Sequence, residues 1–439
     1  MRGTGPRAAA VTVWLLTRAV LLLCVFGALT LSGPDVTSDI RVIYAGWADL
    51  LGDGSFPHDD VTWQYPPLAA LPVLAPTLLP WSYPTGFFLL ACATDAGVLA
   101  LLWRAAARPG ASPAGVWVWI AGLPLLGPTA YARYDVMVTA LVVGALLLAV
   151  RHPRTAGVLC GLGAMTKVWP ALLLVGLARD SRGRRLLVGT LCTAVGTLAL
   201  CLLAAPGSLN FLFAQRDRGT EVESLGAMVF HLWRWFGWEG RVELHYGSME
   251  FLGPHVPLVS TLALALNLAA FGWLLLWRLR ATRNGWLSDL GDGTLWADAA
   301  FVAVLLFTTT SRVISPQYLL WLVGVGAVCL TRRGSRQQGP VLLVLPACGL
   351  TLLEFPLGFA HVVASDGWGV TLLGLRNGLL VAACVWGGLR LWRAPTPRRP
   401  APTAPPARTA PGQRSARRGR HRAGGGPSHQ APQPSSSRR

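Results

Sequence analysis

The residues of this chain that could do chemistry are a few ionisable side chains within or beside long apolar runs. Lys167 is the clearest case and lies in Gly161-Leu-Gly-Ala-Met-Thr-Lys-Val-Trp-Pro170. It is the only lysine of the 439 residues, and Pro170 should break a helix directly after it. An ionisable group at membrane depth is costly and usually functional, and a compact ammonium suits a phosphate. We therefore predict that Lys167 binds phosphate; a lysine reaching for the membrane surface is the alternative.

Two polar turns between apolar runs supply further candidates. The first is Ala132-Arg-Tyr-Asp-Val136, and the second is Thr310-Ser-Arg-Val-Ile-Ser-Pro-Gln-Tyr318. Their arginines, Arg133 and Arg312, could also bind phosphate. Asp135 could instead pair with Arg133 at the membrane interface, where an ion pair contributes little, or with Lys167, which would make both residues structural.

Two acidic segments contain the remaining candidates. Residues 33–63 hold six acids against one arginine, and residues 206–256 hold six acids against four arginines. In the first, Asp39 is a candidate general base, with helix capping as the alternative. In the second, Arg218, Glu221 and Glu223 could bind substrate or be solvated charges. The chain has no His-Glu-x-x-His or Asp-x-Asp motif, so we expect no metal and no cofactor.

The stretch from Asp39 to Leu51 predicts a helix with one apolar face. That face is formed by Ile40, Ile43, Tyr44, Trp47 and Leu51. A helix of this kind is suited to lie on the outer leaflet of a membrane. The Pro-rich residues 65–80 should follow it along the same interface.

The elements that must position these residues are membrane helices. The chain is 53% hydrophobic and 13% charged, with a mean hydropathy of +0.47, whereas soluble domains carry about 25% charged residues. We predict an all-α polytopic membrane protein with ten spans. They lie near 9–32, 85–103, 114–131, 134–150, 186–205, 257–277, 298–314, 317–331, 340–356 and 371–392. Residues 155–178 have basic clusters on both sides and should form two half-spanning helices that meet near Lys167–Pro170.

Basic residues set the orientation of these spans. Clusters of arginine alternate with the two acidic loops, which places both termini in the cytoplasm and both loops, 33–63 and 206–256, outside the plasma membrane. Residues 393–439 hold eleven arginines and no acid, which explains much of the net charge of +18. We expect this Pro- and Arg-rich tail to be disordered and to contact anionic lipid rather than nucleic acid.

The order and spacing of these motifs resemble glycosyltransferase family 87, bacterial integral membrane proteins of the GT-C fold group that use polyprenol-phosphate-mannose. The opening of that family is similar to Asp39-Ile-Arg-Val-Ile-Tyr44 followed by Tyr65-Pro-Pro-Leu-Ala-Ala-Leu71. Further matches are Arg133-Tyr-Asp135, Gly161–Pro170, Arg218-Gly-Thr-Glu-Val-Glu-Ser224 and Val313-Ile-Ser-Pro-Gln-Tyr-Leu-Leu-Trp321. The last is also similar to a segment of eukaryotic glycosylphosphatidylinositol mannosyltransferase I. The resemblance covers about residues 10–392.

The resemblance implies a GT-C-like bundle of about 10–12 spanning or half-spanning helices over residues 1–392. It implies inverting transfer of a hexose, mannose in the family, from a polyprenyl-phosphate sugar to a lipid or glycan acceptor at the outer face of the plasma membrane. The catalytic aspartate of the family falls on Asp39, with Asp35 as the other possible position. Lys167, Arg133 and Arg312 would stabilise the leaving phosphate. The substrate-binding candidates are Asp35, Tyr44, Tyr65, Asp135, Arg218, Glu221, Glu223, Gln317 and Tyr318.

Two other functions compete with this one. In a transporter or lipid flippase, Lys167 and Asp135 would bind the substrate or a coupling ion. The large acidic loop and the lack of a visible internal repeat disfavour it. An inactive membrane scaffold is the other possibility, and the presence of the Asp39 and Lys167 motifs argues against it.

Overall fold

The fold is a bundle of apolar helices, known from a computed structural model that describes residues 4–205, 207–213 and 218–393. Among these residues, six helices are long and apolar enough to cross a membrane. They are α1 (Thr4–Val25), α4 (Tyr83–Ala106), α8 (Ser181–Ala204), α10 (Val256–Arg283), α13 (Gln338–Leu352, extended by the π-helix η7, Leu353–Leu357) and α15 (Gly367–Trp392). The predicted all-α polytopic membrane fold is confirmed. The predicted tail lies outside the described residues, except for Arg393.

Shorter apolar helices fill the interior of the bundle. They are α5 (Ala114–Leu126, followed by the 3-10 turn η4, Gly127–Ala130), α6 (Asp135–Leu148), α11 (Thr294–Thr310) and α12 (Tyr318–Leu330). Each of the ten predicted spans therefore contains one helix. In α12 every residue after Tyr318 is buried. A helix of its length rises about 20 Å, less than the ~30 Å of a bilayer core, so one of its ends must lie below the membrane surface.

The predicted break at Lys167 is confirmed. Helix α7 (Pro153–Thr166) ends at Lys167, whose backbone is extended, and the chain resumes as the 3-10 helix η5 (Trp169–Gly176). Helix α7 packs along α8 through its glycines, because a Cβ on Gly157 would lie only 2.3 Å from the Leu186 carbonyl oxygen. This pairing makes α7 and α8 parallel, so η5 must return to the end of the bundle where α7 began. The segment is re-entrant, with a 3-10 helix as its second half.

A buried ion pair joins the first helices of the bundle. The Arg18 guanidinium of α1 lies 2.8 Å from the Asp95 carboxylate of α4, and both side chains are almost fully buried. Trp119 and Tyr131 donate hydrogen bonds to the same carboxylate. Since a buried charge without a partner is strongly destabilising, this pair fixes α1, α4 and α5 against one another.

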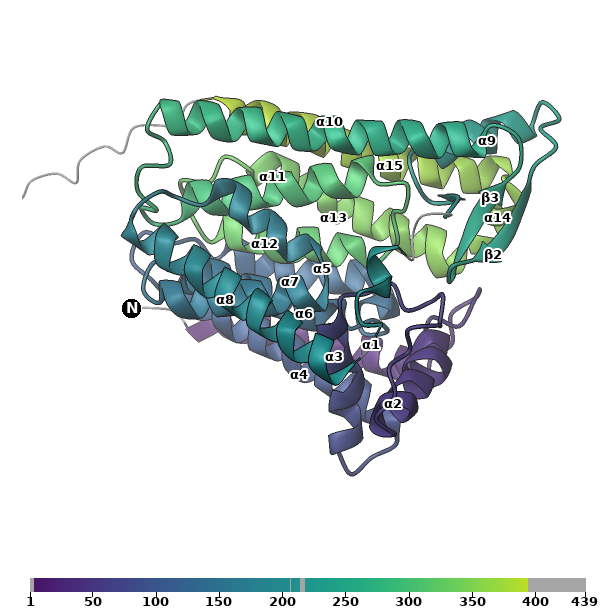
Figure 1. Ribbon diagram of the computed structural model, residues 1–439, viewed down its shortest axis with the longest axis horizontal. Coiled ribbons are helices and arrows are strands. Elements are labelled where there is room, and N and C mark those ends of the chain that lie inside the picture. Colours follow the sequence, from purple (N-terminus) through teal and green to yellow (C-terminus); the bar gives the residue numbers. More distant parts are fainter. Residues whose placement is uncertain (1–3, 206, 214–217, 394–439) are drawn as a thin grey trace, which may run out of the picture. The chain divides into compact units, whose positions relative to one another are not determined.

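The acidic segments form a small cap beside one end of the helices (Figure 1). The first, together with the Pro-rich residues after it, contains η1 (Asp39–Tyr44), α2 (Ala45–Gly52), η2 (Pro67–Ala69), α3 (Ala70–Leu74) and η3 (Ala75–Leu78). The second contains η6 (Asn210–Leu212), β1 (Thr220–Glu221), α9 (Ala227–Arg234), β2 (Arg241–His245) and β3 (Ser248–Leu252). Its strands form an antiparallel sheet in the order β1-β3-β2, with Glu221 opposite Glu250. Helix α14 (Phe359–Ala364) lies beside this cap (Figure 1).

The apolar face of the predicted amphipathic helix packs on protein, so the interpretation that this face lies on lipid was wrong. The segment begins as a π-helix, and Ile40, Tyr44 and Trp47 on its apolar face are buried in the protein. The ring of Tyr44 stacks on that of Trp47, with their centroids 5.3 Å apart. Its centroid lies 5.9 Å from that of Phe87 of α4. An apolar helical face can pack equally well on lipid or on protein, and only the fold decides between them.

The arginines at the helix ends predict which end of the bundle faces the cytoplasm. Helix α10 starts near the β-sheet and ends in Arg278, Arg280 and Arg283. We expect Ser55→Cys, in the acidic cap, to react with a membrane-impermeant thiol reagent in intact cells. Ser288→Cys, in the exposed turn after α10, should react only after permeabilisation. The unmodified protein gives the background, and labelling at 288 from outside would reverse the orientation.

Candidate active site

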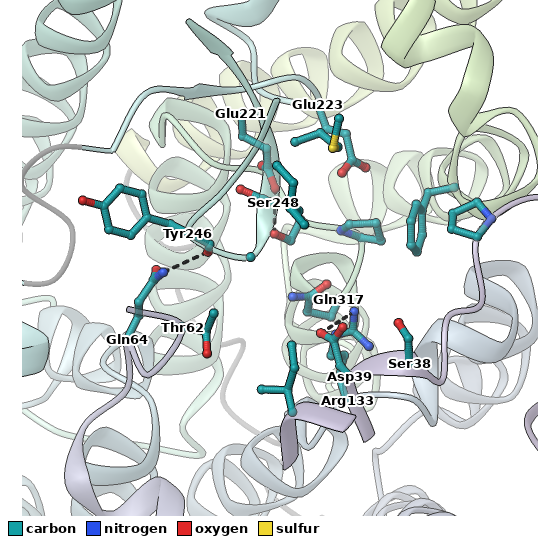
Figure 2. A pocket seen from close by; sticks show the side chains of 18 of the residues that line it. Ser38, Asp39, Thr62, Gln64, Arg133, Glu221, Glu223, Tyr246, Ser248 and Gln317 are labelled. Atoms are coloured by element: carbon teal, nitrogen blue, oxygen red, sulfur yellow. Dashed lines mark hydrogen bonds and ion pairs between the residues drawn. The ribbon is translucent and has the colours of Figure 1, made fainter. Parts of the chain in front are cut away.

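A polar cavity of about 360 Å³ lies between the two acidic segments and the polar turns of the helices. Its wall contains most of the candidate residues, namely Asp35, Asp39, Tyr44, Tyr65, Arg133, Lys167, Arg218, Glu221, Glu223, Gln317 and Tyr318. Figure 2 shows Asp39 and Arg133 on one side of the cavity and Glu221 and Glu223 on the other. Segments far apart in the sequence therefore meet around one space.

Among the ion-paired side chains that line the cavity, Asp39 is the most exposed. Its Oδ2 lies 2.8 Å from Nη2 of Arg133, and its side chain is 30% exposed. Arg133 is held in place by hydrogen bonds to the carbonyl oxygens of Val36 and Ala132. Asp39 thus combines a fixed position with an open face, which a general base requires.

Asp35 has a different environment. One of its oxygens accepts hydrogen bonds from the backbone N–H and the hydroxyl of Thr37, at 2.8 and 2.7 Å. This arrangement is an Asx turn that shapes the chain just before η1. Of the two aspartates, Asp39 is the one whose carboxylate pairs with a cationic side chain of the cavity wall.

Lys167 lines the cavity and is paired with Asp135. Its Nζ is 2.8 and 2.9 Å from the two carboxylate oxygens, and Asp135 is almost fully buried. Trp321 donates a further hydrogen bond to Asp135. The rings of Tyr65, Tyr134, Tyr318 and Trp321 surround the ammonium, with centroids 5.2–5.8 Å from Nζ.

Arg218 joins the sheet to the first acidic segment. Its guanidinium donates to Glu250 at 2.6 Å and to Gln64 at 2.9 Å, and also to the hydroxyl of Ser248. Burial opposes its charge, but the carboxylates of Glu221 and Glu250 outweigh burial and raise the pKa of Arg218. Arg218 therefore stays charged as part of the cavity wall.

Glu221 holds the turn between α11 and α12. Its carboxylate accepts hydrogen bonds from the N–H of Ile314 at 2.6 Å and the hydroxyl of Ser315 at 3.0 Å. This contact positions the following Gln317 and Tyr318 in the cavity wall. Both hydrogen bonds of the Glu221 carboxylate are therefore made within the protein.

Arg312 does not line this cavity. It faces a neighbouring groove along the start of α10, and its Nη1 donates to the Arg218 carbonyl oxygen at 3.0 Å. Burial, and then the charge of Arg218, lower the pKa of Arg312. The structure thus separates Arg312 from Arg133 and Lys167, with which the sequence had grouped it.

Some residues around the site were not identified from the sequence. Glu250 and Ser248 bind Arg218, and Trp321 and Tyr134 surround the Lys167 pair. Glu354 and Arg376 form a further buried ion pair behind the cavity. Glu354 and Arg376 could have been identified from the sequence, because each is an ionisable residue inside an apolar run. In the part of the chain that the structure describes, no group of three or more His, Cys, Asp or Glu side chains could hold a metal ion.

The comparison with protein families decides the class of this site. The sequence profile of glycosyltransferase family 87 matches residues 63–289, just over half of the chain. The chain belongs to glycosyltransferase family 87. The comparisons with curated proteins and with solved structures gave no match. Family 87 membership and the apolar helices together make the chain a membrane glycosyltransferase, and they disfavour the transporter and flippase alternative.

The family 87 match contains only part of the cavity wall. It includes Arg133, Lys167 and Arg218, but it begins after Asp39 and ends before Gln317. The fold brings those outlying residues to the matched ones. The first acidic segment and the turn before α12 are therefore parts of the same site.

The Lys167–Asp135 pair leads to a prediction about stability. Lys167→Gln should lower the thermal unfolding temperature, because the buried Asp135 would lose its partner, a loss of about 3–5 kcal/mol. Adding Asp135→Asn should restore most of the lost stability. Arg182→Gln removes more exposed pairs with Asp180 and Asp289 and should cost less, about 1 kcal/mol.

Donor binding by the stable double variant then tests the second role predicted for Lys167. A strong loss of donor affinity in that variant would support a contact between Lys167 and the donor phosphate. Unchanged affinity would make Lys167 purely structural.

Proposed function

We propose that this membrane glycosyltransferase transfers a hexose, mannose by the family resemblance, from a polyprenyl-phosphate sugar to a lipid or glycan acceptor. The observation that carries the proposal is the accessible Asp39 carboxylate, held by Arg133 in a polar cavity beside the bundle. The cavity lies at the ends of the helices opposite the arginine clusters, so the positive-inside rule supports an outer-face reaction at the plasma membrane.

In the proposed reaction Asp39 removes the proton from the acceptor hydroxyl. The acceptor oxygen attacks the anomeric carbon from the face opposite the phosphate, the bond from that carbon to the phosphate oxygen breaks, and polyprenyl phosphate leaves. The configuration at the anomeric carbon is inverted. One base is sufficient, because a phosphate is already a good leaving group when cations stabilise it.

Arg133 and Lys167 are the proposed cations for that phosphate. Arg133 pairs with Asp39 and lines the same cavity, so it lies near the reacting carbon, from whose opposite face the phosphate leaves. Lys167 contributes from the cavity wall, although Asp135 offsets much of its charge. Arg312 could act on a donor only from the neighbouring groove.

Aromatic rings supply the proposed sugar-binding surface. Tyr44, Tyr65 and Tyr318 line the cavity together with the polar Gln317. Aromatic side chains combine a flat apolar face with a polar edge, which suits the alternating C–H and O–H groups of a hexose. Arg218, Glu221 and Glu223 face them from the second acidic segment.

The decisive experiment incubates the purified full chain with radiolabelled polyprenyl-phosphate mannose and a membrane lipid extract. The proposal expects label to appear in a new glycolipid or glycan. If no label is transferred from this donor or from other polyprenyl-phosphate hexoses, the proposed function is wrong.

The same assay tests the base. Asp39→Asn should reduce transfer about 10²–10⁴-fold, because the amide cannot accept the proton. Asp53→Asn, in the exposed loop end after α2, is the matched control and should retain activity. If Asp39→Asn keeps more than about a tenth of the activity while Asp35→Asn is inactive, Asp35 is the base.

A further inference from the structure

Glu223 differs from every other carboxylate in the cavity wall that we have described. It is almost fully buried, yet its Oε1 has no hydrogen-bond partner in the part of the chain that the structure describes. Glu221, two residues earlier, accepts two hydrogen bonds from the protein. Figure 2 shows both side chains at the same side of the cavity. Glu221 is therefore bonded to the protein, whereas Glu223, which also lines the cavity, has a buried oxygen without a hydrogen bond.

The groups packed against Glu223 do not supply it with a cation of its own. Arg376 of α15 hydrogen-bonds Glu354 through Nε and Nη2, and it also donates to the Glu223 backbone carbonyl at 3.0 Å. Its nearest approach to the Glu223 carboxylate is 3.9 Å, beyond hydrogen-bond distance. Asn377 donates only to that same backbone carbonyl. The charged groups around the Glu223 side chain are thus Arg376, Glu354 and Glu221.

This environment favours a neutral carboxylic acid. One guanidinium cannot offset two buried carboxylates at once, and it is already bonded to Glu354. Burial, and then the charges of Glu354 and Glu221, raise the pKa of Glu223 well above its usual range. A protonated carboxyl group has an O–H to donate, which an ionised one lacks.

The other charges of the cavity indicate what that O–H could bind. Arg133, Lys167 and Arg218 each have a carboxylate partner, namely Asp39, Asp135 and Glu250. An anionic ligand entering the cavity therefore meets little net positive charge, and an ionised Glu223 would repel it. A neutral acid adds a hydrogen-bond donor without adding negative charge.

We propose that Glu223 binds the lipid-linked donor as a neutral carboxylic acid, donating a hydrogen bond to a phosphate oxygen. Ionisation of Glu223 then ends donor binding, so that affinity is retained below its pKa and lost as the pH rises through it. This inference rests on the proposed function, because it takes a polyprenyl-phosphate sugar as the ligand.

The test measures binding of polyprenyl-phosphate mannose and of polyprenyl phosphate to the full chain in detergent, across about pH 6–9. For the unmodified protein, affinity should fall about tenfold per pH unit above the pKa of Glu223. Glu223→Gln keeps a neutral donor, so it should weaken binding by less than about tenfold and remove this pH dependence. Polyprenyl phosphate itself titrates near pH 6. The affinities of the unmodified protein and the variant are therefore compared at the same pH, where the ligand has the same charge.

Glu243→Gln is the matched control, since Glu243 is exposed on β2 and pairs with Arg241. It should keep the pH profile of the unmodified protein. If Glu223→Gln abolishes binding while the protein stays folded, an ionised carboxylate is required and the inference is wrong. It is also wrong if both proteins show the same pH profile.

Two further outcomes are distinct. If polyprenyl-phosphate mannose binding depends on Glu223 and polyprenyl phosphate binding does not, the hydrogen bond goes to the sugar and the phosphate assignment is wrong. If the unmodified protein binds neither ligand at any pH, the proposed function itself fails.

Discussion

The ion pair between Lys167 and Asp135 is the interaction on which the rest of the site depends. A charge in the interior of a helix bundle is stable only with a partner, and this pair lies where α7 gives way to η5. Asp135 is the first residue of α6, and Trp321 of α12 donates to it. The pair therefore ties the broken helix to two others, and Lys167 and Tyr318, the first residue of α12, line the cavity.

The same constraint recurs at each junction of the bundle. Arg18 with Asp95, Arg376 with Glu354, and Arg218 with Glu250 are buried pairs whose members come from different elements. Removing one partner of such a pair would leave a buried charge unpaired, which is destabilising. Each pair therefore fixes the relative position of the segments that carry it. The cavity lies among elements joined by such pairs, and an electrostatic active site requires groups that are held in fixed positions.

Burial separates the structural carboxylates of the cavity from those available for chemistry. Asp135 and Glu250 are fully paired and inaccessible, whereas Asp39 is paired but open. Glu223 is buried without a hydrogen bond to its free oxygen. A base and a neutral donor can thus coexist in one cavity, since the environment of each group sets its protonation state.

The sequence by itself determined the membrane helices, the break at Lys167 and the charged residues of the cavity wall. Hydropathy, proline and isolated charges act over a few neighbouring residues, so one chain is sufficient to read them. Only the tertiary structure decided that the apolar face around Tyr44 packs on protein, that Lys167 meets Asp135, and that Arg312 faces another groove. These outcomes depend on which distant segments pack together, because a partner for a buried charge or an apolar face is supplied by a different part of the chain.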